Sequence, residues 1–518
     1  MARVLSNNVS LSYTIETSLG VAGTTWFQLE PNDITTFGAT ITKVARNPIS
    51  RLRDRRKGVV TDLDSAVEFE SDLTGSAFED FVEGFCFSTA VNSDTDFAAT
   101  AAETTGDTYT VASLSAAQAA KLQFSAAEYA TLLFARGFVN AGNNGIKSLD
   151  TDASATDTAL AVAEDLVDEA SPPANAEVQL AGVRFLDGAS DIAIAYSAPS
   201  LTITVSNIVG FDWTTLGLTV GQIVHVGGTT DAGVVANAAQ NAVANDQFGY
   251  GRITSITANV LTLDKLSPAL RNDAPTIPAT FDILFGKFIR NVAVDSAEYL
   301  ERSFQMEAVF PDLESLGVDA YQYSRGNFVN TVGINLPTTD KATVSFAFIG
   351  TDTDNPTTVR ASGASASIAP NATSAFGTSS DIAQLTLQNT DETDLGSCFK
   401  SLTMNINNNV SPEKVIGTLG GKFINTGDFE IDVEAQLIFE NRTIIDAIRN
   451  NDTLTMGFVV RNEDGAIAFD IPSMTLDGGG RDFPENETVL INTTAQAFFD
   501  PVFGYSLGIS IIPKVPTQ

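Results

Sequence analysis

The sequence predicts a mostly β protein, and three observations support that fold class. Stretches rich in Thr, Val, Ile and Phe recur along the chain. Within them apolar residues alternate with polar ones, as Val344, Phe346 and Phe348 do in KATVSFAFIG, which is typical of strands with one buried face. Gly, Asn and Asp separate these stretches and indicate turns, whereas helix signals are scarce.

One short helix is predicted around residues 78–85. Ser76 and Glu79 have the spacing of a capping box, in which each side chain accepts a backbone N–H group at the helix start. Apolar side chains then recur at helical spacing: Phe78, Phe81, Val82 and Phe85. This apolar face should pack on a sheet.

The composition is that of a folded, strongly acidic chain. Its 518 residues exceed the ~100–200 of a typical domain, so more than one domain is expected. Hydrophobic residues make up 43% of the chain, which is enough to form cores. The 29 Lys and Arg against 63 Asp and Glu give a net charge of −34, which argues against general nucleic-acid binding because such binding depends on neutralising phosphates.

No signal peptide or membrane segment is predicted. The N-terminal stretch MARVLSNNVSLSYTIE lacks the apolar region that a signal peptide needs, and no run of ~18 apolar residues occurs. The two cysteines, Cys86 and Cys398, form neither a disulfide framework nor a zinc spacing. We therefore expect a protein made in the cytoplasm and without a membrane partner.

Two segments far apart in the chain resemble each other, which predicts a duplicated domain. DLDSAVE at 62–68 aligns without gaps with DFEIDVE at 428–434. The same register places FEDFV at 78–82 on IIDAI at 444–448, so an acidic strand leads into a short helix in both copies. The later strands KATVSFAFIGTD and ETVLINTTAQAFFD also correspond.

A shorter similarity lies between these copies. Residues 143–170 resemble residues 245–270, since each reads as a strand, a polar turn and a second strand. This predicts two small β modules, at 96–195 and 196–285, inserted into the first large domain. Residues 351–380 are rich in Thr, Ser and Ala and are predicted to form an extended linker or arm.

No pattern indicates an enzyme. The single histidine, His225, has no Ser or Cys nucleophile motif beside it, and we expect it to be exposed or packed at a module surface. DTDASATD at 150–157 lacks the Gly and the final Glu of a calcium loop, so a polar turn is the better interpretation. NAGNNG and DGGGRD match neither the P-loop nor the dinucleotide fingerprint. No catalytic residue, metal ligand or cofactor site is predicted.

Positive charge is concentrated in one stretch, ARNPISRLRDRRKG at residues 45–58. Its basic side chains are Arg46, Arg51, Arg53, Arg55, Arg56 and Lys57. The loop could be merely solvated, or it could contact DNA, although aromatic interleaving is absent and the rest of the chain would repel DNA. We favour a contact with an acidic surface of another copy of the protein, because Arg meets carboxylates bidentately and such charge complementarity fixes register.

Three stretches resemble the major tail tube proteins of bacteriophages with long, non-contractile tails. They are ARNPISRLRDRRKGVVTDLDSAVEFESDLTGSAFEDFVEGF, AEYLERSFQMEAVFPDLES with YSRGNFVNTVGINLPTTDKATVSFAFIGTD, and INNNVSPEKVIGTLGGKFINTGDFEIDVEAQL. Together they cover most of residues 1–90 and 285–518. These motifs are packing and loop patterns rather than an active-site signature. The insert at 96–285 is similar to the small extra domains that some members carry on the outside of the tube.

The resemblance implies two tail-tube-type β-sandwich domains, each with a short flanking helix. The first would comprise residues 1–95 with 286–350, and the second would comprise residues 381–518. The resemblance further implies self-assembly into closed rings that stack into a hollow tube for DNA ejection. With two domains in each chain, three chains would form a pseudo-six-fold ring, and a hexamer is the alternative.

The same resemblance implies the partners and the location of the protein. The loop at 45–58 would contact a neighbouring ring or subunit, and residues 407–421 are its less basic counterpart. Other tail proteins would bind the tube ends, and double-stranded DNA would pass without specific binding because an acidic wall does not retain it. The protein would be located in the virion tail. Two other structural interpretations stay open, a capsid or baseplate protein and a β-modular surface adhesin.

Overall fold

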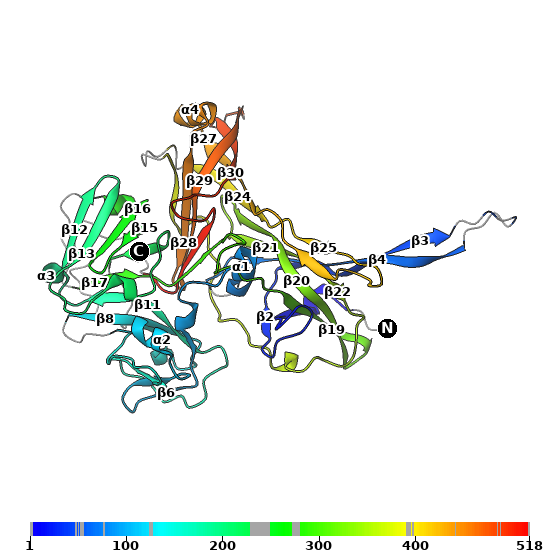
Figure 1. Ribbon diagram of the computed structural model, residues 1–518, viewed down its shortest axis with the longest axis horizontal. Helices are drawn as coiled ribbons and strands as arrows, with labels where there is room; N and C mark the ends of the chain where they lie inside the picture. Colours follow the sequence, from blue (N-terminus) through cyan, green and yellow to red (C-terminus); the bar gives the residue numbers. More distant parts are fainter. Residues whose placement is uncertain are drawn as a thin grey trace.

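The computed structural model of the protein describes residues 4–46, 49, 51, 56–75, 78–123, 128–227, 249–271, 280–389, 395, 398–440, 442–483, 485–486 and 488–515. The fold is mostly β, as predicted, and its antiparallel sheets are consistent with a β-sandwich (Figure 1). A long two-stranded hairpin extends away from the body, and the insert lies at the opposite side (Figure 1).

Within the described residues, sixteen strands belong to one sheet system, and twelve of them fall into two sets. The first strand set consists of β1 (Ser10–Ile15), β3 (Asp33–Arg46), β4 (Arg56–Asp72), β19 (Phe304–Ser315), β20 (Val318–Leu336) and β21 (Thr343–Gly350). The second strand set consists of β23 (Ile382–Asn389), β24 (Phe399–Asn407), β27 (Glu430–Ile438), β28 (Leu454–Asn462), β29 (Gly465–Asp482) and β30 (Leu490–Ala497).

The two sets have the same pairing order. The first pairs as β1-β19-β20-β21-β4-β3, and the second pairs as β23-β28-β29-β30-β27-β24. All of these pairs are antiparallel, and corresponding strands also follow each other in the same order along the chain. The remaining strands of the system are β2 (Phe27–Leu29), β18 (Lys287–Arg290), β22 (Asp352–Thr353) and β31 (Gly508–Ile512).

The sets are joined edge to edge inside the chain. β20 pairs with β24 over six residues, from Thr331 opposite Asn407 to Leu336 opposite Leu402. The C-terminal strand β31 adds a second connection, because it pairs with β29 on one side and with β18 on the other. A separate hairpin, β25 (Ser411–Glu413) with β26 (Phe423–Asn425), lies in the loop after β24.

Each set carries one short helix at the same position. α1 (Glu79–Cys86) follows β4, and α4 (Thr443–Asn450) follows β27. The predicted helical face of α1 is confirmed, since Phe81 and Phe85 are buried against the sheet together with Phe78. The helix begins after Phe78, whose side chain makes no cap hydrogen bond, and Ser76 of the predicted capping box lies outside the described residues.

The insert forms its own sheets. Ten strands of residues 96–284 make one sheet: β5 (Asp96–Ala98), β8 (Tyr129–Arg136), β9 (Gly145–Ser148), β11 (Glu177–Phe185), β12 (Ile192–Ser197), β13 (Ser200–Val205), β14 (Ile223–Val226), β15 (Gly249–Ile256), β16 (Val260–Asp264) and β17 (Phe281–Leu284). A smaller sheet contains β6 (Ala101–Glu103), β7 (Thr108–Thr110) and β10 (Ala159–Ala161), and the helices are α2 (Ala116–Lys121) and α3 (Gly188–Asp191).

The large sheet contains strands of both predicted modules. The two segments that resemble each other are paired differently, because β15 and β16 form a hairpin, whereas β9 pairs with β8 and β10 pairs with β7. Beyond these strand pairs, the segment around β10 also turns back along the end of β9. Leu149 forms an antiparallel bridge with Val162, and the N–H groups of Asp150 and Ala163 donate 2.9 Å hydrogen bonds to the carbonyls of Ala161 and Ser148. The division into two modules, at 96–195 and 196–285, stays a prediction.

The insert packs on the second strand set, although the chain enters and leaves it from the first. Leu132, Phe134 and Ile223 of the insert share a buried apolar cluster with Val459 and Ala468 of β28 and β29. A buried ion-pair network crosses the same contact. The guanidinium of Arg252 lies 2.7 Å from Asp264 and 3.1 Å from Asp470, and Tyr505 donates a 2.7 Å hydrogen bond to Asp470.

The segment 351–380 is extended and lies along the first strand set of its own chain. The N–H group of Gln28 donates a 2.8 Å hydrogen bond to the carbonyl of Ile368, and the side chains of Ala364 and Phe376 are fully buried. Arg360 pairs with the buried carboxylate of Glu307 at 2.5 Å. Two apolar residues of this segment, Ala364 and Phe376, are therefore buried within the chain.

Candidate assembly surfaces

β3 and β4, which flank the basic loop in the sequence, form the hairpin that projects from the body (Figure 1). Arg46 and Arg56 face each other as the last paired residues of the two strands. Arg46, Arg51, Arg56 and Lys57 are exposed, and in the described part of the chain none of these four has an ion-pair partner. Arg53 and Arg55 lie outside the described residues.

The hairpin also exposes apolar side chains. Ile41, Val44 and Val59 are each more than half exposed, at 52%, 57% and 59%. A two-stranded ribbon without a sheet or helix beside it is marginally stable in water. Exposed apolar and basic groups on such a ribbon therefore favour a contact with another molecule.

One face of the joined sheet is acidic. Along β4 the carboxylates alternate with buried residues, so that they share the face opposite the core: Asp62, Asp64, Glu68, Glu70 and Asp72. On β27, Glu430, Asp432 and Glu434 alternate in the same way with the buried Ile431 and Val433.

The register of the sheet arranges these carboxylates in rows. One row runs from Glu68 through Ala347, Thr331 and Asn407 to Glu430. The next two rows run from Glu70 to Asp432 and from Asp72 to Glu434, and their middle positions are held by Ser345, Gly333 and Asn405 and by Thr343, Asn335 and Thr403. Each row begins and ends with a carboxylate and has neutral residues between, which makes this face a negatively charged surface that extends across both strand sets.

The contact between the two sets uses polar groups as well as strand pairing. The buried side-chain amide of Asn408 donates hydrogen bonds to the carbonyls of Phe85 (2.9 Å) and Val329 (3.1 Å). Lys414, in the loop after β24, lies 2.6 Å from both Asp62 and Asp64 of β4. These hydrogen bonds raise the pKa of Lys414, and the bond to Lys414 lowers the pKa of Asp62.

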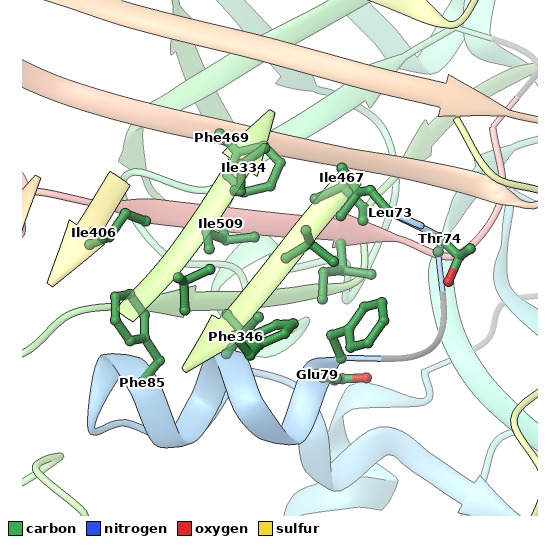
Figure 2. Close-up of a pocket in the computed structure, with 16 residues that line it drawn as sticks. Leu73, Thr74, Glu79, Phe85, Ile334, Phe346, Ile406, Ile467, Phe469 and Ile509 are labelled. Atoms are coloured by element: carbon green, nitrogen blue, oxygen red, sulfur yellow. The ribbon is translucent and has the colours of Figure 1, made fainter. Parts of the chain in front are cut away.

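Figure 2 shows a small cavity between α1 and strands of both sets. It is lined mainly by apolar side chains, including Phe85, Ile334 and Phe346 near the first set and Ile467 and Phe469 of β29. Its volume of about 50 Å³ is well below the ~300–1,000 Å³ of a small-molecule site. We interpret it as a packing cavity beneath α1, and the helix is thus covered from both sets.

A cluster of charged groups connects the insert to the first set. Lys287 of β18 lies 2.6 Å from Glu79 of α1 and 2.6 Å from Asp96 of β5. Burial raises the pKa of Glu79 although Lys287 opposes this shift, and the same two carboxylates raise the pKa of Lys287. Arg136 pairs with Glu177 nearby. The carboxylates that could suggest acid–base chemistry are therefore bound in ion pairs between structural elements.

The histidine and the two cysteines noted in the sequence occupy packing positions. His225 is 2% exposed and lies where the insert meets the second set, so the expectation of an exposed or module-surface histidine is wrong in its first part. Burial lowers its pKa to about 3, so the imidazole is neutral at pH 7. Cys86, the last residue of α1, is buried, which raises the pKa of its thiol, while Cys398 is partly buried.

Among the residues that the structure describes, no group of three or more His, Cys, Asp and Glu side chains is arranged to hold a metal ion. The same residues include no helix that is both long enough and apolar enough to cross a membrane.

Comparison with known families supports a phage tail protein. A family described as "Phage tail tube protein" matches residues 265–497, which contain the whole second strand set and β19–β21 of the first. No curated protein matches the chain. The match supports a structural role in the tail of a virion, and the family is not known as one of enzymes. The family implies self-association into a tube.

Sequence reasoning found the basic loop and the acidic strands but missed two features of the surface. The rows of carboxylates depend on the register between β4, β21, β20, β24 and β27, which no local pattern reveals. The strand edges without a neighbour depend on how distant segments pair in the whole sheet. The alignment of DLDSAVE with DFEIDVE was the one signal in the sequence that could have located both.

Proposed function

We propose that the protein is the tube subunit of a long, non-contractile phage tail, and that it self-assembles into stacked rings around a channel for DNA ejection. The observation that carries this proposal is the joint between β20 and β24. It already connects two strand sets of the same topology into one continuous sheet, and the family match spans both sides of the joint. Further joints of this kind would close the sheet into a ring and remove its exposed edges.

We propose two tube domains per chain, residues 1–95 with 286–350 and residues 381–518, and hence three chains per ring. The equal pairing order of the two strand sets supports a duplication. Residues 96–285 would lie outside the channel as an inserted unit, and residues 351–380 would be the extended connection between the domains. Other tail proteins would bind the two ends of the tube.

The acidic face would line the channel. DNA has about one negative charge per 1.7 Å of helix axis, so a basic wall would bind it with release of counterions, whereas a wall of carboxylates repels it. The repulsion acts over ~8–10 Å at physiological salt, which is the range that matters near a wall. Rows that begin and end with carboxylates support this placement, because they carry the charge around the sheet.

The basic loop would be an inter-subunit contact. Arg46, Arg51, Arg56 and Lys57 are exposed at the tip of a projecting hairpin, which supports the proposed contact of the whole loop, including Arg53 and Arg55, with acidic groups of another copy.

Electron microscopy of the purified full-length protein at high concentration tests the proposed function, together with mass measurement of the smallest ring. We expect hollow tubes with a regular axial repeat and three chains per ring. Closed shells or particles without a channel would contradict the tube, and six chains per ring would contradict the duplication while leaving the tube intact.

A further inference from the structure

We infer that the joint between neighbouring chains of a ring reproduces the joint between the two strand sets of one chain, residue by residue. This inference rests on the proposed tube function and deepens it by naming the contacting strands, their register and the ion pairs. The partner is a second copy of this chain.

The free edges of the chain have the right form for this joint. In the first set, the C-terminal half of β20 has β21 on one edge and β24 on the other. In the second set, the corresponding half of β29, Thr475–Asp482, pairs with β30, and no described strand lies on its other edge. β3 corresponds to β24, pairs with β4, and has no described strand on its other edge either. Each chain thus presents the two edges that are joined inside it.

The aligned acidic strands give the register. From Glu68, cross-strand neighbours lead through Ala347 to Thr331. From its counterpart Glu434, they lead through Thr494 to Asp477. Thr331 and Asp477 therefore hold equivalent places on β20 and β29.

The same procedure relates the two partner strands. Thr36 lies opposite Glu68, and Thr403 lies opposite Glu434, so Thr36 of β3 corresponds to Thr403 of β24. Inside the chain Thr403 faces Asn335, and Thr403 Oγ1 donates a 3.3 Å hydrogen bond to Asn335 Oδ1. The position equivalent to Asn335 is Asp482, because Asn335 is reached from Asp72 and Asp482 from its counterpart Ile438.

The joint between chains should therefore place Thr36 of one copy opposite Asp482 of the next. Four residues further along β3, Thr40 should face Asp477, as Asn407 faces Thr331 inside the chain.

Charge complementarity supports the same partner. Inside the chain, Lys414 of the second set binds Asp62 and Asp64 of the first. In the alignment of DLDSAVE with DFEIDVE, these carboxylates correspond to Asp428 and Glu430. Both are exposed, and within the described residues neither has an ion-pair partner. The loop that corresponds to the Lys414 loop is the one between β3 and β4, so the described cations at its two ends, Arg46 and Arg56, should meet Asp428 and Glu430 of the next copy.

This assignment explains why the two loops differ in charge. The Lys414 loop is tethered to its partner by the same chain, so its effective concentration is high and a single cation is sufficient. The basic loop must attract and orient a separate chain, for which long-range charge complementarity increases the association rate and selects the register. The helices differ in the same sense: α1 is covered by both sets, whereas Ile445 and Ile448 of α4 remain partly exposed.

Disulfide crosslinking in assembled protein tests the register. The variant Thr36→Cys/Asp482→Cys should form disulfides between chains on oxidation, because directly opposite residues have Cβ atoms about 4.5–5.5 Å apart and small shifts bring these within disulfide range. A covalent ladder that ends at three chains is expected on denaturing gels. Thr40→Cys/Asp477→Cys should give the same ladder and serves as the second variant if the first does not assemble.

The matched control is Thr36→Cys/Arg481→Cys, whose second cysteine moves by one residue and so to the other face of the strand. It should give little crosslinking. Equal crosslinking in test and control, or tubes of either test variant without interchain disulfides, would overturn the register while leaving the tube function intact. Absence of tubes from the unmodified protein would instead overturn the proposed function.

Charge exchange tests the ion pairs. Asp428→Lys/Glu430→Lys should raise the protein concentration needed for polymerisation by about tenfold, because two favourable pairs are replaced by repulsion. Adding Arg46→Glu/Arg56→Glu should restore most of the loss. The control Glu103→Lys/Asp165→Lys makes the same charge change on the insert and should have no effect. An equal effect of the control, or no rescue by the exchanged charges, would contradict the assignment.

Discussion

The two strand sets have the same topology, but they differ in what surrounds them. In the first set, β24 pairs with the edge of β20 that β21 leaves free, and side chains of both sets pack around α1. The extended segment 351–380 lies along the same set. The second set has an unpaired edge on β29 and a half-exposed α4, and it is covered instead by the insert. Because the two sets consist of equivalent elements, the neighbours that the first set has and the second set lacks indicate the contacts that another copy of the chain has to provide.

The comparison also concerns the hairpins. In the second set the loop after β24 folds back, forms β25 and β26, and binds Asp62 and Asp64 through Lys414. In the first set the equivalent hairpin is straight and its described basic residues are unpaired (Figure 1). The two loops thus occupy equivalent places, but only the loop after β24 forms ion pairs within the described part of the chain.

Removing the insert should have the largest effect, because it uncovers the second strand set. Deletion of residues 96–285 with a short linker exposes the apolar surface of β28 and β29 and leaves Asp470 without Arg252. Each fully exposed Val or Ile loses about 1.5–3 kcal/mol of burial free energy, so we expect insoluble or unfolded protein. Soluble expression and thermal unfolding would measure this. Soluble, thinner tubes would show that the second set is stable without its cover.

Substitution at one end of β29 should be far more costly than at the other. Asp470→Ala removes one of the two carboxylates that pair with the buried guanidinium of Arg252, together with the acceptor of the Tyr505 hydroxyl, and should destabilise the chain by about 3 kcal/mol. Asp477 lies in the half of the same strand that pairs with β30 on one edge and with no described strand on the other. Asp477→Ala should change the free energy of unfolding by less than about 0.5 kcal/mol. Denaturant unfolding of both variants measures the contrast, and similar costs at the two sites would contradict it.

The two helices provide a third contrast. Phe81→Ala in α1 removes a fully buried ring and should cost about 3–5 kcal/mol of unfolding free energy. Ile448→Ala in α4 removes a partly exposed side chain and should cost about 1 kcal/mol in the isolated chain. If α4 is covered by the next copy, Ile448→Ala should weaken polymerisation more than folding, which sedimentation of tubes across a concentration series can detect.

A last contrast concerns the pH dependence of the contact under the insert. His225 is neutral in the folded chain because burial lowers its pKa to about 3, while in the unfolded chain it binds a proton below its ordinary value of 6.5. The unfolded state therefore binds more protons between about pH 6.5 and 3, and stability falls as the pH decreases, by up to about 1.4 kcal/mol per pH unit. His225→Phe should lack this component. A difference between variant and parent that stays constant from pH 7.5 to 4.5 would contradict it.

Much of the fold could be predicted from local patterns. Strands such as β21 were predicted by the alternation of Val344, Phe346 and Phe348, and α1 by its apolar face. The alignment of DLDSAVE with DFEIDVE places α4 as well as β27. The position of His225 could not be predicted, because β14 is buried on both faces by the insert and by the second set, and neither contact is encoded near the residue. The path of residues 351–380 was equally inaccessible, since its contacts with Gln28 and Glu307 are long-range.

The sequence by itself determined the mostly β class, the acidic character of two equivalent strands and the concentration of positive charge in one loop, because these properties depend on residue type and spacing. Only the tertiary structure decided which strand edges are paired, how the carboxylates align in rows, and which set the insert covers. These features arise from contacts between segments far apart in the chain, as between β20 and β24 or Arg252 and Asp470. Small differences in packing free energy there select one arrangement among many with the same local pattern.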